Sequence, residues 1–153
     1  MNAINKNKAI VIMGVSGSGK STIGKLLAEK IQIPFFDGDD FHSRENVEKM
    51  ASGKPLNDED RKGWLLQLNA LIKENENENG CIIACSSLKE SYRKILSREV
   101  SNSIKFVFLQ GSYSEILFRL ESRKNHFIPS SLLKSQFETL ENPQNAYTLS
   151  IMQ

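Results

Sequence analysis

The sequence has neither a long hydrophobic run nor an excess of one charge. No signal peptide is visible, because residues 1–8 are largely polar and the apolar run that follows at residues 9–15 is too short to span a membrane. Lysine and arginine number 20 against 18 aspartates and glutamates, and the net charge of +2 is too small to indicate a nucleic-acid or polybasic membrane surface. We therefore expect a cytoplasmic protein without a nucleic-acid or membrane partner.

Cysteine is also scarce, with only Cys81 and Cys85 in the chain. In a strand, a spacing of four residues places both side chains on one face, about 13 Å apart, whereas a disulfide requires Cα atoms within about 7 Å of each other. No second pair of cysteines or histidines lies nearby in the sequence to complete a zinc site. The pattern predicts two buried free thiols, which are typical of a reducing compartment.

What is present is the composition and periodicity of one α/β domain. The 153 residues are 39% hydrophobic and 25% charged, which is ordinary for a globular domain with a core of its own. Five short apolar runs predict strands at residues 9–13, 33–36, 81–84, 104–109 and 147–151. Apolar residues recur at helical spacing in 23–31, 64–72 and 116–120. This alternation predicts a parallel sheet covered by helices on both faces.

A glycine-rich segment after the first expected strand matches the P-loop pattern G-x-x-x-x-G-K-[ST] at every fixed position. Glycines let the backbone curl so that successive N–H groups and the N-terminus of the next helix point at phosphate oxygens. Lys20 is expected to reach the β- and γ-phosphates of ATP, and the Ser21 hydroxyl is expected to bind Mg²⁺. The loop residues expected to contact the nucleotide are Gly14, Val15, Ser16, Gly17, Ser18, Gly19, Lys20, Ser21 and Thr22.

Three acidic residues, Asp37, Asp39 and Asp40, follow directly after the second expected strand. Ligands of open α/β sheets bind at the carboxyl ends of strands, and clustered carboxylates there favour a cation or a transferable proton. A kinase offers both, since it binds Mg²⁺ and its substrate hydroxyl loses a proton on attack. The alternative is a surface turn in which Asp39 or Asp40 is the N-cap of the next helix.

Residues 35–65, FFDGDDFHSRENVEKMASGKPLNDEDRKGWL, resemble the gluconokinase pattern D-G-D-x-x-H-x-x-x-N-x-x-K-M-x-x-G-x-P-L-x-D-x-D-R-x-x-W-L. MGVSGSGKST, ACSSLKESYR, RLESRKNHF and QFETLE match the same family in order, so the resemblance runs from about residue 10 to residue 143. It implies a P-loop NTPase fold with a five-stranded parallel sheet in a single domain, residues 1–153. It also implies a substrate-binding helical segment at about 40–72 and a mobile lid at about 119–137.

The same resemblance implies ATP-dependent phosphorylation of D-gluconate to 6-phospho-D-gluconate, with particular residues in particular roles. Asp39 is the candidate base for the attacking hydroxyl, and Asp37 would help to hold the water shell of Mg²⁺ beside Ser21. The residues that would line the gluconate site are Asp39, His42, Arg44, Arg61, Ser86, Lys89 and Arg93. Arg119 and Arg123 would reach the triphosphate from the lid, with Arg123 acting in catalysis beside Lys20. His126 is either lid packing or a substrate contact.

Two features depart from the family pattern. Gly63 stands before Trp64 where the family usually has proline, which loosens a helix start without removing a reactive group. The chain as given stops at Gln153, whereas family members usually continue with a proline-containing loop and a helix. From this shortened C-terminus we expect an exposed apolar face near residues 147–151 and weak discrimination between ATP and GTP.

Two other functions remain open on the sequence. A kinase of the same fold could act on another small hydroxy acid such as shikimate, although the long substrate segment argues against it. The second alternative is a truncated, non-catalytic nucleotide-binding protein. This alternative is disfavoured by the presence of Lys20, Ser21, Asp37 and Asp39. The resemblance also makes a homodimer plausible.

Overall fold

The computed structural model describes residues 9–76, 78–101, 104–122 and 130–151. The five expected strands form one parallel sheet in the order β2-β3-β1-β4-β5. They are β1 (Ala9–Met13), β2 (Phe35–Asp37), β3 (Cys81–Ala84), β4 (Lys105–Gln110) and β5 (Tyr147–Ser150). The predicted sheet is confirmed, and its strand ends lie within about two residues of the predicted positions.

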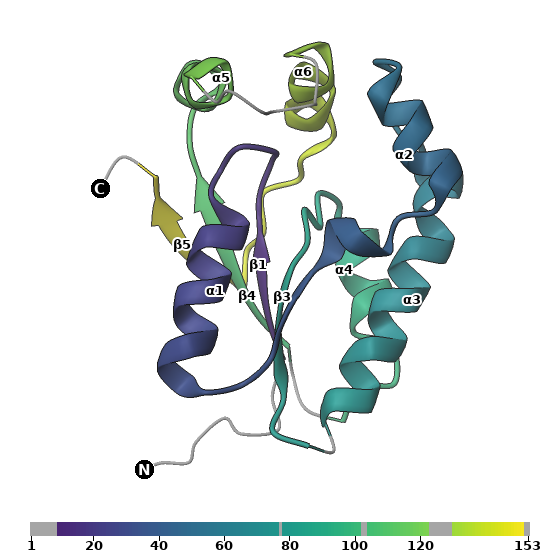
Figure 1. Cartoon of the computed structure of the whole chain (residues 1–153), viewed down its shortest axis with the longest axis vertical. Helices are drawn as coiled ribbons and strands as arrows, with labels where there is room; N and C mark the ends of the chain where they lie inside the picture. Colours follow the sequence, from purple (N-terminus) through teal and green to yellow (C-terminus); the bar gives the residue numbers. More distant parts are fainter. Residues whose placement is uncertain (1–8, 77, 102–103, 123–129, 152–153) are drawn as a thin grey trace.

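Helices cover both faces of this sheet. They are α1 (Lys20–Ile31), a 3-10 helix η1 (Gly38–Phe41), α2 (Arg44–Ala51), α3 (Asp58–Glu76), α4 (Glu90–Leu96), α5 (Tyr113–Ser122) and α6 (Ser130–Thr139). Figure 1 shows α1 on one face and α3 with α4 on the other, while α2, α5 and α6 stand at the end toward which the strands run. Within the described residues, no helix combines the length and hydropathy needed to cross a membrane.

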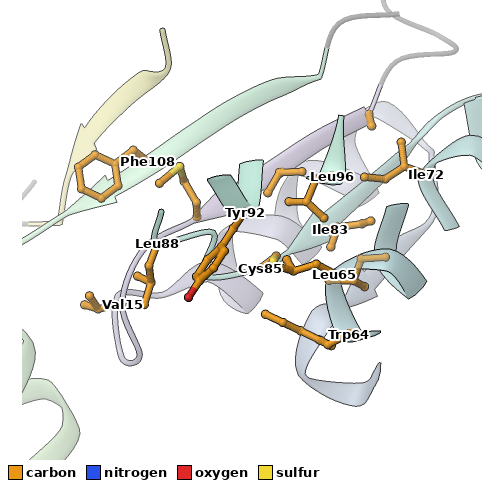
Figure 2. Packing of buried hydrophobic residues seen from close by; sticks show 14 of the residues in the cluster. Val15, Trp64, Leu65, Ile72, Ile83, Cys85, Leu88, Tyr92, Leu96 and Phe108 are labelled. Carbon is orange, nitrogen blue, oxygen red and sulfur yellow. The ribbon is translucent and has the colours of Figure 1, made fainter. Parts of the chain in front are cut away.

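Alternate side chains of the central strand β1 enter two separate cores. Val11 and Met13 pack into the larger core with side chains of α3 and α4, part of which Figure 2 shows, while Ile12 packs into the smaller core with Ala28 of α1. All four side chains are buried. Burial on both faces explains why this strand is a continuous apolar run in the sequence.

Both cysteines are buried free thiols, as predicted. Cys81 and Cys85 lie with Ile83 in the larger core, so the three residues share one face of the sheet. Burial raises the pKa of the Cys81 thiol to about 12 and that of Cys85 to about 11. Neither thiol is therefore ionised at neutral pH, which fits a structural role.

Strand β5 forms an edge of the sheet and pairs with β4. Its four residues are exposed, and the side chains of Tyr147 and Leu149 are 63% and 48% exposed. The expected apolar exposure at this edge is confirmed for Tyr147 and Leu149, whereas Ile151 is half-buried and packs against both cores.

Candidate active site

The P-loop, residues 14–21, connects β1 to α1 at the carboxyl end of the sheet. Gly14, Gly17 and Gly19 have φ angles of 147°, 81° and 99°, values that glycine adopts far more readily than other residues. The Gly14 N–H donates to the carbonyl oxygen of Ser86 at 3.2 Å. This bond fixes the start of the loop against the segment that follows β3.

Ser21 and Asp37 meet although 16 residues separate them. The Ser21 hydroxyl donates to Oδ2 of Asp37 at 2.9 Å, and the backbone N–H of Asp39 donates to Oδ1 of Asp37 at 3.0 Å. Among the described residues no group of three or more His, Cys, Asp or Glu could hold a metal ion. One hydroxyl and one carboxylate fit Mg²⁺, which usually keeps several water ligands and shares substrate phosphates with few protein groups.

Asp39 lies between a cation and two other carboxylates. Its surroundings, although they leave the side chain accessible, desolvate the carboxyl group and raise its pKa above the ordinary value of 3.8. The carboxylates of Asp37 and Asp40 raise the pKa further, and Lys20 acts in the opposite direction. A carboxylate whose proton affinity is increased in this way is suited to accept a proton from a hydroxyl group.

The alternative capping role for Asp39 or Asp40 is wrong. The N-cap of α2 is Ser43, whose hydroxyl accepts the backbone N–H of Asn46 at 3.1 Å. Asp37 caps the preceding 3-10 helix instead. The extra turn of η1 leaves Asp39 and Asp40 inside that turn, too early in the chain to cap α2.

His42 and Trp64 form one wall beside the acidic segment. Their rings stack with centroids 4.0 Å apart, and Trp64 Nε1 donates to the carbonyl oxygen of Gly38 at 2.7 Å. Desolvation and the nearby Arg61 guanidinium lower the pKa of His42 to about 4, so this ring is neutral at physiological pH. A cavity of about 540 Å³ here is lined by Asp40, Phe41, His42, Ser43, Asn46, Asp60, Gly63, Trp64 and Gln67.

A second polar cluster joins α3 to the start of α4. Tyr92 is its centre, because its hydroxyl donates to Asp58 at 2.5 Å and accepts a hydrogen bond from Arg61 Nη1 at 3.0 Å. Lys89 Nζ also donates to Asp58 at 3.0 Å. The hydrogen bonds from Tyr92 and Lys89 hold the pKa of Asp58 below its usual value. The adjoining cavity of about 540 Å³ is lined by Leu56, Asn57, Asp58, Glu59, Arg61, Lys89, Tyr92 and Thr139.

Arg93, a predicted gluconate ligand, is committed to the protein itself. Its buried guanidinium donates to the carbonyl oxygens of Ser87, Leu88 and Glu141 and pairs with the carboxylate of Glu90. It lies beside a larger hollow of about 610 Å³, which is lined by Glu90, Arg93, Lys94, Ser97, Ile104, Phe106 and residues 141–146. None of the P-loop residues lines that hollow.

Arg44 and Ser86 occupy different surroundings from the two polar cavities. The Arg44 side chain is 89% exposed at the start of α2 and pairs with Glu48 at 3.2 Å. Ser86 is half-buried, and its carbonyl oxygen holds the P-loop as described above. The structure therefore brings His42, Arg61 and Lys89 to the cavities, but Arg44 lines neither of them.

Arg119 lies where α5 approaches the P-loop. Its Nη2 donates to the carbonyl oxygen of Ile151 at 2.7 Å, and its Nη1 would be 3.8 Å from a Cβ placed on Gly19. The guanidinium of Arg119 therefore lies beside Gly19 of the P-loop. Arg123 and His126 lie outside the described residues.

No role for Tyr92, Asp58 or Gln136 was predicted from the sequence, although all three contact predicted site residues. One indication was available. Asp58 precedes Arg61 by three residues, and Lys89 precedes Tyr92 by three, and this spacing places side chains on the same face of a helix. The contact between the two pairs depends on the packing of α3 against α4, which no local spacing reveals.

Comparison with known proteins gives one consistent result. The family model described as "Shikimate kinase" matches residues 16–148. The thermosensitive gluconokinase of Escherichia coli (strain K12) is 49% identical over 141 residues, which cover 90% of this chain and 73% of that protein. The crystal structure of a gluconokinase from Sinorhizobium meliloti 1021 superposes with a TM-score of 0.87 at 40% identity, covering 98% of this chain and 86% of that one. An unliganded sugar kinase from Janibacter sp. HTCC2649 superposes with a TM-score of 0.90 at 40% identity, covering 95% and 86%.

Proposed function

This chain belongs to the gluconokinase family, within the wider group that the shikimate kinase model describes, and we propose that it phosphorylates D-gluconate with ATP. The γ-phosphoryl group of ATP passes to a hydroxyl group of the sugar acid, which yields 6-phospho-D-gluconate and ADP. The observation that carries the proposal is the 49% identity to a gluconokinase over 90% of this chain. The P-loop beside Ser21, Asp37 and Asp39 supports the same reaction.

The nucleotide binds along residues 14–22 in this proposal. Backbone N–H groups of the loop and the N-terminus of α1 hold the phosphates, and Lys20 places a positive charge on the β- and γ-phosphates. Ser21 and Asp37, which are 2.9 Å apart, would hold Mg²⁺ directly or through its water ligands. When bound, Mg²⁺ neutralises the negative charge that develops on the transferring phosphoryl group.

Asp39 takes the proton of the attacking hydroxyl. The hydroxyl oxygen forms the new bond to the γ-phosphorus, the bond from that phosphorus to the bridging oxygen breaks, and the electron pair leaves with ADP. The raised pKa of Asp39 increases its affinity for the proton that the hydroxyl releases. Arg119 and Arg123 are proposed to contact the triphosphate from the side of α5.

The sugar acid lies against the carboxyl ends of β2 and β3 in this proposal. Arg61 and Lys89 supply positive charge for the carboxylate, because both line the cavity beside Tyr92. His42 contributes a neutral ring that can hydrogen-bond to a substrate hydroxyl. Arg44, Ser86 and Arg93 remain candidate ligands on the family resemblance.

The test is an ADP-release assay with ATP, Mg²⁺ and a panel of acids that includes D-gluconate, shikimate and other sugar acids. We expect turnover with D-gluconate to exceed that with every other acid, and mass spectrometry to identify a phosphorylated gluconate. Preferential turnover of another acid would show that this acid, and not D-gluconate, is the substrate. Nucleotide binding without turnover on any acid would favour a non-catalytic nucleotide-binding protein.

We also propose a cytosolic location, since two buried thiols suit a reducing compartment.

A further inference from the structure

A side chain of α6 lies directly on the P-loop. The backbone N–H of Ser16 donates to Oε1 of Gln136 at 2.7 Å, and Nε2 of Gln136 donates to the Ser16 hydroxyl at 3.0 Å. The two residues are 120 positions apart in the chain. One carboxamide thus forms two hydrogen bonds to a single loop residue.

Ser16 stands in the middle of the loop whose N–H groups bind phosphate oxygens. In this structure its N–H is occupied by the carbonyl oxygen of a glutamine side chain. The phosphate-binding Lys20 has a comparable arrangement, because its Nζ donates to the carbonyl oxygen of Val15 at 3.0 Å. Two donors that phosphate would use therefore contact oxygens of the protein itself.

The backbone that carries Gln136 is held firmly. Leu132 and Leu133 of α6 are buried in the protein interior, and the N–H of Glu141, just after the helix, donates to the carbonyl oxygen of Leu88 at 2.7 Å. The side chain of Gln136 is only half-buried, so it can rotate about its own χ angles while the helix stays in place. Release of Ser16 does not require α6 to move.

We infer that Gln136 occupies the position of a phosphate oxygen on Ser16 and is displaced when a nucleotide binds. The inference rests on the proposed function only in that the P-loop binds a nucleotide. Gln136 is then a competitor of the phosphates, and it sets nucleotide affinity without contacting the bound nucleotide. A residue that gripped the nucleotide would have the opposite effect on affinity.

Two substitutions at this position separate these roles by the sign of their effect. Gln136→Leu has a similar size but forms neither hydrogen bond, so the Kd for ADP and for a non-hydrolysable ATP analogue should fall about fivefold, the worth of one net hydrogen bond. Gln136→Glu supplies a charged acceptor for the Ser16 N–H and repels the phosphates, so Kd should rise about tenfold or more. Calorimetric titration with Mg²⁺ present and gluconate absent measures both values.

Gln144→Leu is the matched control, because Gln144 is exposed and lies in a loop away from the P-loop. It should leave the Kd for ADP unchanged, and the melting temperature of each variant shows whether it folds. The inference is overturned if Gln136→Leu weakens nucleotide binding, which would make Gln136 a direct ligand. It is also overturned if folded Gln136→Leu binds ADP like the unsubstituted chain, which would make the contact structural only.

A spectroscopic measurement tests the displacement itself. The side-chain NH₂ resonances of Gln136 in a ¹H–¹⁵N spectrum are identified by their absence in Gln136→Leu. On addition of ADP they should move toward the positions of a solvent-exposed glutamine, while unchanged resonances at saturating ADP would contradict displacement. Because ADP alone is used, failure of the chain to phosphorylate gluconate would leave this result intact.

Discussion

The phosphate loop and the substrate cavities are built in opposite ways. The loop comprises consecutive residues, and its shape follows from glycines with positive φ and from backbone hydrogen bonds. The substrate side draws its groups from η1, α3 and α4, and its central contact joins Arg61 to Tyr92 across 31 residues. A short pattern in the sequence therefore suffices to identify the loop, whereas the substrate side exists only after α3 and α4 have packed together.

Because of this difference, substitutions in the two regions should affect different properties of the protein. A change at Lys20 or Ser21 of the loop should affect the chemistry and leave the fold intact, because neither residue belongs to the two apolar cores. A change in the polar cluster around Tyr92 should affect gluconate binding and stability together, because the same hydrogen bonds serve both. The following substitutions test this contrast, beginning with the largest expected effect.

Lys20→Ala should lower kcat by about 10³-fold, since it removes the positive charge from the phosphates at the point where charge develops during transfer. The melting temperature should change little. Lys25→Ala is the matched control, because Lys25 is exposed on the same helix. Near-normal turnover of Lys20→Ala in the ADP-release assay would exclude the assigned role of this lysine.

Asp39→Asn should lower kcat by about 10²-fold while ATP still binds, because the amide keeps the shape but cannot accept the proton. Glu29→Gln, which removes the same charge from an exposed position on α1, should retain the activity. In the unsubstituted chain, kcat should fall with decreasing pH as Asp39 becomes protonated, around a pKa above 3.8. If ATP affinity collapses in Asp39→Asn and turnover stays high, the residue belongs to the metal site.

Tyr92→Phe should raise the KM for gluconate by several-fold and leave the KM for ATP unchanged. The substitution removes the hydroxyl that connects Arg61 and Asp58, and we expect a loss of about 1–2 kcal/mol in the free energy of unfolding. Tyr113→Phe on α5 is the control, since Tyr113 is partly exposed and packs edge-on against Phe137. An unchanged KM for gluconate together with lower stability would restrict Tyr92 to a structural role.

Protonation of His42 should have a smaller effect, a decrease in the free energy of unfolding at low pH. Its pKa is lowered from 6.5 to about 4, so between these values the unfolded chain binds more protons and stability decreases as pH falls. After allowance for solvent screening, the decrease should be about 1–2 kcal/mol. Urea unfolding of the unsubstituted chain and of His42→Gln at pH 7 and pH 4.5 isolates this effect. The two chains should differ in their pH dependence, and identical curves would contradict the lowered pKa.

The sequence predicted the sheet well because each strand has its own local pattern. β1 and β3 are continuous apolar runs that are buried on both faces, and the P-loop motif fixes the turn after β1. The resemblance to gluconokinases is confirmed by the relatives described above. These features depend on neighbouring residues, so reading the chain in order is enough to find them.

The substrate side was predicted less completely, for a physical reason. Arg93 is a candidate ligand for gluconate, and the sequence did not reveal that its guanidinium has carbonyl partners as far as Glu141, 48 residues along the chain. His42 was named as a candidate ligand from the sequence. Its lowered pKa and the stacking of its ring on Trp64 were not predicted. A long side chain can satisfy its hydrogen bonds in several directions, and which partners it has depends on how distant segments approach one another.

The buried thiols of Cys81 and Cys85 provide a probe of opening in the central sheet. Thiol reagents attack the thiolate, and these side chains are almost completely shielded from solvent, with pKa values of about 12 and about 11. The rate of labelling should therefore report how often β3 and its flanking residues become exposed. Ser86 follows β3 by two residues, and its carbonyl oxygen accepts a hydrogen bond from the Gly14 N–H of the P-loop. Labelling with and without ADP would therefore measure how strongly nucleotide binding stabilises the centre of the molecule.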